Sequence, residues 1–399
     1  MRVTVALVAA LLVFAGALGP VRTLAGEGQG QKPSPPFRPF VVSGDFIHVS
    51  GMLPTGATGA IVAGDIKAQT KQALANVAAA IEKAGGRMSD VAAVNVYLNQ
   101  ASDFAAMNEV YGTAWPTDPP VRTTVVANLV IPEALLEISA IGLRPGAERV
   151  VVHPADWQRS PSPYSYGIRS GNTLFLAGLV SRSGRDNKAV AGDITAQTRL
   201  VLDNARAILQ AAGMSFADVV AARVYITDTK MFEEMNAAYR QAFSKDPPAR
   251  ATVRVGLMSP EYLVEIALRA VKTTDRTAIV PPNADGSPGR PSPNLSGAIR
   301  AGNRLFVSGM LGATDATRGN VGAQVRETLA RIGRTLAAAG FGWPQVVEST
   351  VFITDISNFA AMNDVYRSIV PAPWPARATV ETGLVSPDGL VEIMVVASK

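Results

Sequence analysis

The sequence contains no cysteine and only two histidines, His48 and His153, among its 399 residues. The lack of cysteine excludes disulfides, a thiolate nucleophile, thiolate metal ligands and an acyl anchor on an N-terminal cysteine. Two histidines far apart in the sequence do not indicate a zinc site, and no Gly-x-Ser-x-Gly motif accompanies them as it would in many serine hydrolases. We therefore expect both histidines to be ordinary surface or strand residues, and we expect neither a metal nor a cofactor.

Charged residues are also few, at 17% of the chain against 48% hydrophobic residues. The net charge of +5 comes from scattered lysines and arginines with no basic block. Such a distribution implies a mild attraction to anions and does not predict a nucleic-acid partner. The length is sufficient for two or three domains, each with its own hydrophobic core.

A long apolar run occurs only near the start of the chain. A single Arg2, an apolar stretch over 3–18 and then small residues predict a secretory signal peptide over 1–25. Cleavage is expected after Ala25, with an earlier cut after Gly19 as the alternative. A membrane anchor is the competing interpretation, but a run of about 16 apolar residues is shorter than the roughly 20 that a spanning helix needs. We expect a periplasmic or secreted protein with no membrane association after cleavage.

Internal repetition is the dominant feature of the sequence. The stretch DPPVRTTV at 118–125 returns as DPPARATV at 246–253 and as PWPARATV at 373–380. Each copy also has a Phe-x-x-Met-Asn element that begins 18 residues before its arginine, and a glutamate 15 residues after it. The arginines are Arg122, Arg250 and Arg377, and the glutamates are Glu137, Glu265 and Glu392. Fixed offsets at several landmarks in three copies predict a tandem triplication.

Each copy predicts the same order of elements. A strand ends at a Ser/Ala-Gly step and is followed by a loop and a long helix, which in the first copy has Asp65 as its N-cap and Gly85 just past its end. An alternating strand, a short helix over Phe-x-x-Met-Asn and a β-hairpin turning around Pro132-Glu133 complete the unit. The first strands are expected over 46–50, 174–177 and 305–308. The long helices are expected within the segment DIKAQTKQALANVAAAIEKAGG (65–86) and over 194–212 and 321–339. The alternating strands are expected over 91–98, 219–226 and 346–353.

These elements predict an α+β fold in which each copy is a mixed β-sheet with two helices on one face. The bare face of each sheet must be covered, and three copies can achieve this by packing around a pseudo-threefold axis within one chain. Because one chain supplies all three repeats, we expect the protein to be a monomer. The predicted segments after the signal peptide are a polar lead-in over 26–36, repeats over 37–148 and 150–272, a Pro/Gly-rich linker over 273–289 that looks flexible, and a third repeat over 290–399.

The motifs together resemble the RidA (YjgF) family of enamine/imine deaminases. The resemblance is carried by SPYSYGIRSGNTLFLAGLV at 162–180, the helix GDITAQTRLVLDNARAILQAAG, FEEMNAAY, and PPARATVRVGLMSPEYLVEIALRA. It extends over all three copies. Members of that family form homotrimers with a chorismate-mutase-like fold. The resemblance therefore implies the same fold here, with the three repeats forming a covalent pseudo-trimer that has up to three ligand clefts between its own repeats.

The resemblance also implies roles for residues at matching positions. Arginine would bind the substrate carboxylate, as its paired donors suit a carboxylate, and glutamate would activate the attacking water. These are the arginines and glutamates given above. The other expected substrate-binding residues are Asn108, Asn236 and Asn363 of the short helices, Tyr164, Ser50 and Ser308. Only Tyr164 matches the family tyrosine, because Phe37 and Leu295 take its place elsewhere, and Ala177 replaces the serine in the second copy.

Several alternatives remain open at this stage. The arginines could form inter-repeat ion pairs with the glutamates for packing alone, the asparagines could cap or hold the short helix, and Tyr164 could be a packing aromatic. The function expected from the resemblance is deamination of 2-imino or 2-enamino acids to 2-keto acids and ammonia. A periplasmic, non-catalytic binder of small carboxylates is the first alternative, and an endoribonuclease is the second, for which no histidine pair or basic stripe is evident.

Overall fold

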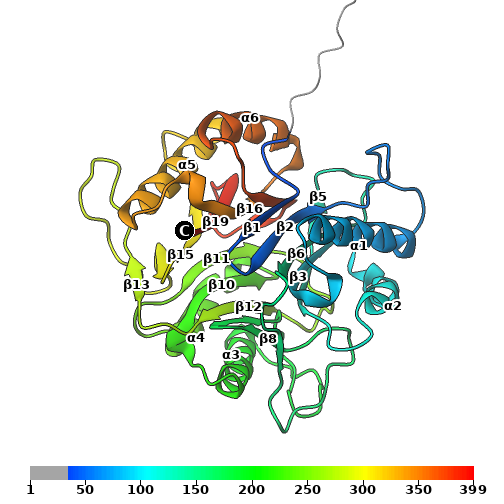
Figure 1. Ribbon diagram of the computed structural model, residues 1–399. Coiled ribbons are helices and arrows are strands. Elements are labelled where there is room, and N and C mark those ends of the chain that lie inside the picture. The colour runs from blue at the N-terminus through cyan, green and yellow to red at the C-terminus, as the bar shows by residue number, and fades with distance from the viewer. Residues whose placement is uncertain (1–34) are drawn as a thin grey trace, which may run out of the picture. The chain divides into compact units, whose positions relative to one another are not determined.

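Three copies of one α+β unit follow one another along residues 35–399, which the computed structural model describes (Figure 1). The predicted signal peptide and most of the predicted polar lead-in lie outside these residues. No helix within 35–399 is both long enough and apolar enough to cross a membrane.

The first copy contains six strands and two helices. Its strands are β1 (Phe40–Ser43), β2 (Phe46–Met52), β3 (Val91–Leu98), β4 (Val121–Val126), β5 (Asn128–Leu129) and β6 (Leu136–Leu143), and its helices are α1 (Ile66–Lys83) and α2 (Phe104–Ala114).

The second and third copies keep this order but each begins with one additional strand, and the second has no counterpart of β5. The second has β7 (Val150–Val152), β8 (Gly167–Ser170), β9 (Thr173–Leu176), α3 (Ile194–Ala211), β10 (Val219–Ile226), α4 (Phe232–Ala242), β11 (Ala249–Arg254) and β12 (Val264–Val271). The third has β13 (Arg276–Ile279), β14 (Ala298–Ala301), β15 (Arg304–Leu311), α5 (Val321–Ala338), β16 (Val346–Ile353), α6 (Phe359–Ile369), β17 (Ala376–Glu381), β18 (Gly383–Leu384) and β19 (Val391–Ser398). The predicted linker over 273–289 is therefore not wholly irregular, because it contains β13, which pairs with β14.

The long helix begins and ends where the sequence predicts. Asp65 caps α1 by accepting a hydrogen bond from the backbone N–H of Ala68 at 3.0 Å, and Asp193 and Asn320 do the same for α3 and α5. Gly85 follows α1 with a φ of +85°, a conformation that glycine adopts without steric cost.

The predicted hairpin is wrong. β4 and β6 do not pair with each other, because β3 lies between them in the sheet order β1-β2-β6-β3-β4. β4 runs parallel to β3, with Arg122 opposite Val94, and β6 runs antiparallel to β3, with Glu137 opposite Tyr97. A parallel pair needs a crossover connection, which α2 supplies between β3 and β4. The chain then passes over the end of β3 to reach β6 on its other side.

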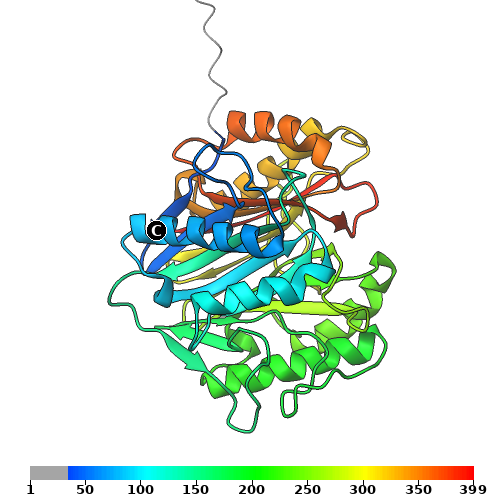
Figure 2. The same ribbon diagram turned by 90° about the vertical axis from the view of Figure 1, so that its right-hand side faces the viewer.

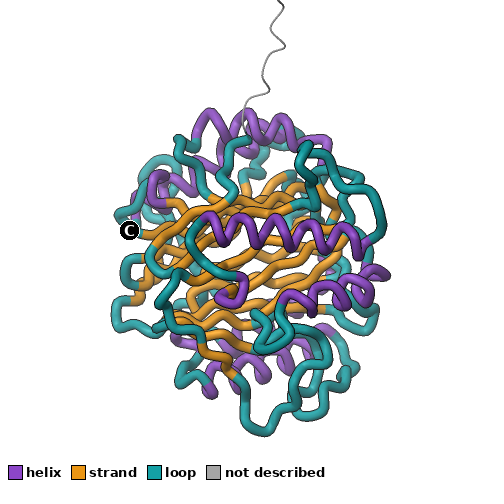
Figure 3. Tube along the Cα trace, turned by 45° about the vertical axis from the view of Figure 1, so that its right-hand side comes forward, coloured by secondary structure: helices purple, strands orange, loops and turns teal. Residues whose placement is uncertain are grey.

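Each sheet carries its two helices on one face, and the other face packs against the sheets of the other copies. Figure 2 and Figure 3 show the helices on the outside and the strands between them. The equivalent residues Tyr97 of β3, Tyr225 of β10 and Phe352 of β16 share one buried cluster. This packing agrees with the pseudo-threefold arrangement expected from the sequence.

The edges of the sheets also join the copies in a cyclic order. β5 of the first copy pairs with β17 of the third, and β18 of the third pairs with β11 of the second. Val126 of the first copy forms a bridge with Gly256 of the second and closes the ring. Each copy therefore has a defined neighbour on either side.

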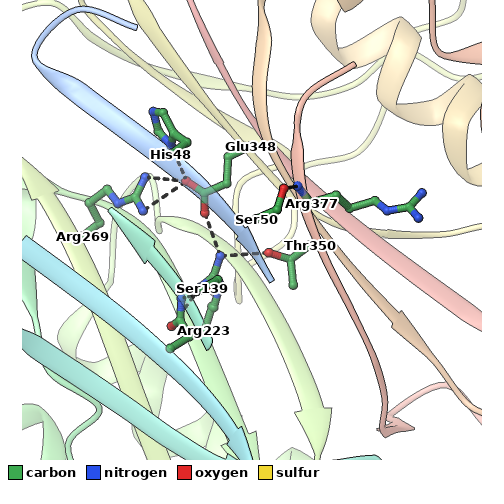
Figure 4. Close-up of polar contacts among 9 residues, drawn as sticks. His48, Ser50, Ser139, Arg223, Arg269, Glu348, Thr350 and Arg377 are labelled. Atoms are coloured by element: carbon green, nitrogen blue, oxygen red, sulfur yellow. Dashed lines mark hydrogen bonds and ion pairs between the residues drawn. The ribbon is translucent and has the colours of Figure 1, made fainter. Parts of the chain in front are cut away.

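A buried ionic cluster lies where the sheets meet (Figure 4). Glu348 of β16 accepts hydrogen bonds from Arg223 of β10 at 2.9 Å and from Arg269 of β12 at 3.4 Å, and it lies 3.1 Å from Nδ1 of His48 on β2. Arg223 also bonds to Asn95 and Thr350, which occupy its own position in the other two copies. The three copies therefore carry different residues at this equivalent position, Asn95, Arg223 and Thr350, and differ from one another where their sheets meet.

Candidate active site

The three landmark arginines occupy the same place in each copy. Each lies at the start of the strand that follows the short helix, and each side chain is buried: Arg122 on β4, Arg250 on β11 and Arg377 on β17. A tyrosine of the preceding short helix lies against each guanidinium, with the ring centroid 4.7 Å from Arg122, 4.7 Å from Arg250 and 4.9 Å from Arg377. Such cation–π contacts fix the guanidinium and partly compensate its burial.

These tyrosines were not predicted as site residues. They are Tyr111, Tyr239 and Tyr366, each three residues after the asparagine of the short helix. Their constant spacing in the three copies was the signal that could have identified them.

The landmark glutamates face the arginine of the neighbouring copy rather than the arginine of their own. The Arg122 guanidinium attracts Glu265, the Arg250 guanidinium attracts Glu392, and the Arg377 guanidinium attracts Glu137. The backbone N–H of Thr124, two residues after Arg122, also donates to Glu265 Oε1 at 3.4 Å. Each cleft is therefore built by two copies.

All three glutamates are buried, and burial raises the pKa of each carboxyl to about 8. The arginine of the neighbouring copy and a backbone N–H oppose this rise but only in part. A carboxyl with such a pKa can exchange a proton with water near neutral pH, as a general acid or base requires.

A glycine makes room for each carboxyl. A Cβ at Gly51, Gly178 or Gly309 would overlap the Oε1 atom of the glutamate in the same copy. The glycine of the Ser/Ala-Gly step is therefore required by the close approach of the glutamate.

The arginines keep unused donors. Nη1 of Arg122, Arg250 and Arg377 is buried without a hydrogen-bond partner, as are Oε1 of Glu137 and Oε2 of Glu392. Burial also lowers the pKa of each arginine, in the case of Arg377 to about 10, so the guanidinium remains charged at neutral pH. A buried cation with a free donor favours an anionic ligand over packing alone.

The asparagines hold the arginines in two of the clefts. Asn236 Oδ1 accepts from Arg250 Nη2 at 2.7 Å, and Asn363 Oδ1 accepts from Arg377 Nη2 at 2.6 Å. In the first copy Asn108 Oδ1 has no partner, so Arg122 is not held in this way.

The serines connect neighbouring copies. Ser50 Oγ accepts from the backbone N–H of Arg377 at 2.8 Å and donates to the Arg38 carbonyl at 2.6 Å (Figure 4). Ser308 does the same between Arg250 N–H and the Ser296 carbonyl. Both hydroxyls are thus engaged with backbone groups beside the site arginines.

The three clefts are not equivalent. Tyr164 and Glu265 of the second copy line a cavity of about 120 Å³ together with Phe104 and Arg122 of the first. The cleft of Arg377 has Phe37 5.1 Å from the guanidinium in place of that tyrosine. The cleft that contains Tyr164 therefore has Ala177 in place of a serine. Ser50 and Ser308 belong to the other two clefts, which lack the tyrosine.

Neither histidine lines the cavity that contains Arg122 and Glu265. His48 is part of the central cluster, and Nε2 of His153 lies 2.9 Å from the Trp157 carbonyl oxygen. Within residues 35–399, no group of three His, Asp or Glu side chains is placed to hold a metal ion.

A family model matches each of the three copies, and known relatives match about a quarter of the chain. The family model described as Endoribonuclease L-PSP matches residues 29–143, 158–272 and 289–399. A RutC family protein of Sulfurisphaera tokodaii is 45% identical over 106 residues, which are 27% of this chain and 85% of that protein. A RutC family protein of Pyrococcus horikoshii is 43% identical over 28% of this chain and 87% of its own length.

Two solved structures are also similar to parts of this chain. RidA from an Antarctic Psychrobacter is 29% identical, covers 31% of this chain and all of its own chain (100%), and has a TM-score of 0.30. A chorismatase, 14% identical, covers 78% of this chain and 93% of its own, with a TM-score of 0.53. The latter is a likeness of fold across more than one copy.

Proposed function

This chain belongs to the Endoribonuclease L-PSP family, which includes the RidA, YjgF and RutC proteins, and we propose that it hydrolyses 2-imino or 2-enamino acids to 2-keto acids and ammonia. The observation that carries the proposal is the same in each cleft. A buried arginine with a free donor from one copy faces a buried glutamate with a pKa of about 8 from the next.

The arginine binds and orients the substrate in this reaction. Its guanidinium donates charge-assisted hydrogen bonds to the carboxylate of a planar imino acid, with Arg122, Arg250 or Arg377 acting in its own cleft. The tyrosine and, in two clefts, the asparagine keep the guanidinium in place. Binding in a fixed orientation lowers the entropic part of the barrier.

The glutamate moves the protons. Its ionised form takes a proton from water as the water oxygen bonds to the carbon of the protonated imine, which gives a carbinolamine. The carboxyl returns that proton to the nitrogen and then removes the proton of the new hydroxyl as the C–N bond breaks. Ketone and ammonia leave, and the proton left on the carboxyl passes to solvent as the ammonia becomes ammonium.

A direct test uses an imine generated by an amino acid oxidase and measures release of keto acid and ammonia. Variants with two arginines changed to glutamine leave one cleft intact, for example Arg250→Gln with Arg377→Gln. We expect the wild type to accelerate hydrolysis over buffer and the triple variant, with Arg122→Gln added, to lose the acceleration while it remains folded. A wild type that gives no acceleration would refute the proposal.

The second candidate function is non-catalytic binding of small carboxylates. It is favoured for the clefts in which Phe37 and Leu295 replace the tyrosine, because an arginine alone can retain an anion. Occupation of those clefts by a keto acid, with turnover confined to the cleft of Tyr164, would support this division.

We also propose that the protein is exported, which is supported by the apolar run over 3–18. An exported enzyme would act on imines formed outside the cytosol. The mass of the mature protein from a periplasmic fraction tests this, because cleavage after Ala25 or Gly19 gives a defined loss.

A further inference from the structure

The cleft between Arg122 and Glu265 contains a second arginine that the other two clefts do not have at this position. Arg182 lines the same cavity, together with Tyr262. Arg182 lies four residues after the glycine of the Ser/Ala-Gly step, where the other copies have Thr55 and Ala313. Tyr262 lies three residues before the glutamate, where the other copies have Ala134 and Gly389.

Arg182 is held in place by neighbours on two sides. Its Nη1 donates to the Tyr262 hydroxyl at 2.6 Å, and its Nη2 donates to the backbone carbonyl of Asn187. Asn187 is itself buried and fixed, because its side chain donates to the Arg159 carbonyl at 3.0 Å and accepts from the Tyr166 hydroxyl at 2.9 Å. Two of the five guanidinium N–H groups are therefore used to position Arg182, and the others are available to a ligand.

The positive charge of the cavity favours a ligand with more than one negative group. Two guanidinium groups, from Arg122 and Arg182, share it with a single carboxyl, Glu265. That carboxyl is largely protonated at neutral pH, because burial raises its pKa to about 8. A ligand with one carboxylate would leave one of the two cations without an anionic partner.

We propose that this cleft takes 2-imino dicarboxylic acids, with the carboxylate next to the imine on Arg122 and the distal carboxylate on Arg182. The inference rests on the proposed function and names the substrate class for one of its three sites. The cavity of about 120 Å³ exceeds by several-fold the volume that one water needs, so a small acid can enter it. The other clefts, with threonine or alanine at this position, keep a preference for monocarboxylic acids.

The test measures binding of products to the Arg250→Gln, Arg377→Gln background, in which only this cleft retains its arginine. Calorimetry compares a 2-keto dicarboxylate of four or five carbons with a 2-keto monocarboxylate of similar length. We expect the dicarboxylate to bind about tenfold more tightly or better, since a hydrogen-bonded ion pair contributes about that factor. Arg182→Gln should remove this preference and leave monocarboxylate affinity within about twofold.

A matched control is Arg185→Gln, which removes an exposed arginine of the same loop that pairs with Asp156 at 3.2 Å. This variant should keep the preference for the dicarboxylate. Tyr262→Phe removes the hydrogen bond that orients Arg182 and should weaken the preference without abolishing it, which guards against a fold defect in the Arg182 variant. Equal affinity of the Arg182→Gln variant and its parent for the dicarboxylate would overturn the proposal.

The same variants separate this inference from the proposed function. If the dicarboxylate preference depends on Arg182 but no imine is hydrolysed, the two-arginine site stands and the hydrolase proposal fails. If monocarboxylic imines are hydrolysed and Arg182→Gln changes neither affinity nor kcat/KM for dicarboxylic imines, the hydrolase stands and this inference fails.

Discussion

Replacing Glu265 by glutamine should change how the stability of the protein depends on pH. Burial raises the pKa of Glu265 from 4.5 to about 8. Between these values the folded protein holds a proton that the unfolded chain has lost, so unfolding releases a proton. The stabilising contribution of the protonated form is complete below pH about 4.5 and is lost as pH rises to about 8. Glutamine does not titrate and removes this dependence.

The size of the effect follows from the pKa difference. One proton released on unfolding changes the free energy of unfolding by about 1.4 kcal/mol per pH unit, so the full range amounts to about 5 kcal/mol for this residue. Urea denaturation of the wild type and Glu265→Gln at pH of about 5, 6.5 and 8 gives the difference directly. The variant should gain stability relative to the wild type as pH rises.

A control replaces Glu261, an exposed glutamate four residues earlier, by glutamine. A carboxylate hydrated in both states should leave the slope of the wild type unchanged. Parallel pH profiles for the wild type and Glu265→Gln would show that burial does not raise the pKa of Glu265, and the argument that this carboxyl is matched to proton transfer near neutral pH would lose its physical basis.

Two further predictions concern the cleft and the centre of the molecule. Gly178→Ala places a Cβ in the space of the Glu265 carboxyl and should lower kcat by about tenfold or more in the background that retains this cleft alone. Gly112→Ala should not lower kcat, because its Cβ would come no closer than 3.6 Å to a neighbouring side chain, that of Pro163, which is an ordinary contact. Equal kcat values for the two variants would contradict the packing argument. Glu348→Ala leaves the buried arginines around it, Arg223 among them, without a counter-ion and should lower the free energy of unfolding by about 3–5 kcal/mol in urea denaturation. A loss below about 1 kcal/mol would mean that the cluster does not hold the copies together.

The local elements of the fold could be predicted because they depend on short-range pattern. The alternating residues of β3, β10 and β16 give their bounds without error, and Asp65 and Gly85 mark the limits of α1. The hairpin could not be predicted correctly from the same pattern. Two strands joined by a short connection suggest a direct pair, and only the tertiary fold inserts β3 between β4 and β6.

The candidate site could be proposed from the sequence where the three copies agree, and not where they differ. Spacing singled out the repeated arginines and glutamates as candidates, but the pairing of each arginine with the glutamate of the next copy depends on how the copies pack. Arg182 and Glu348 each occur in one copy only, so a search for repetition passes over them. Comparison of equivalent positions for residues that break the repeat would have found both.

The most direct test of the account is whether Arg122 works with Glu265 of the second copy or with Glu137 of its own. The measurement is kcat/KM for a monocarboxylic imine in two double variants. Arg122→Gln with Glu265→Gln damages one cleft and should be no less active than Arg122→Gln alone. Arg122→Gln with Glu137→Gln damages two clefts and should be less active than the Arg122→Gln single variant and less active than the first double variant. The opposite order would contradict the assembly of each cleft from two neighbouring copies.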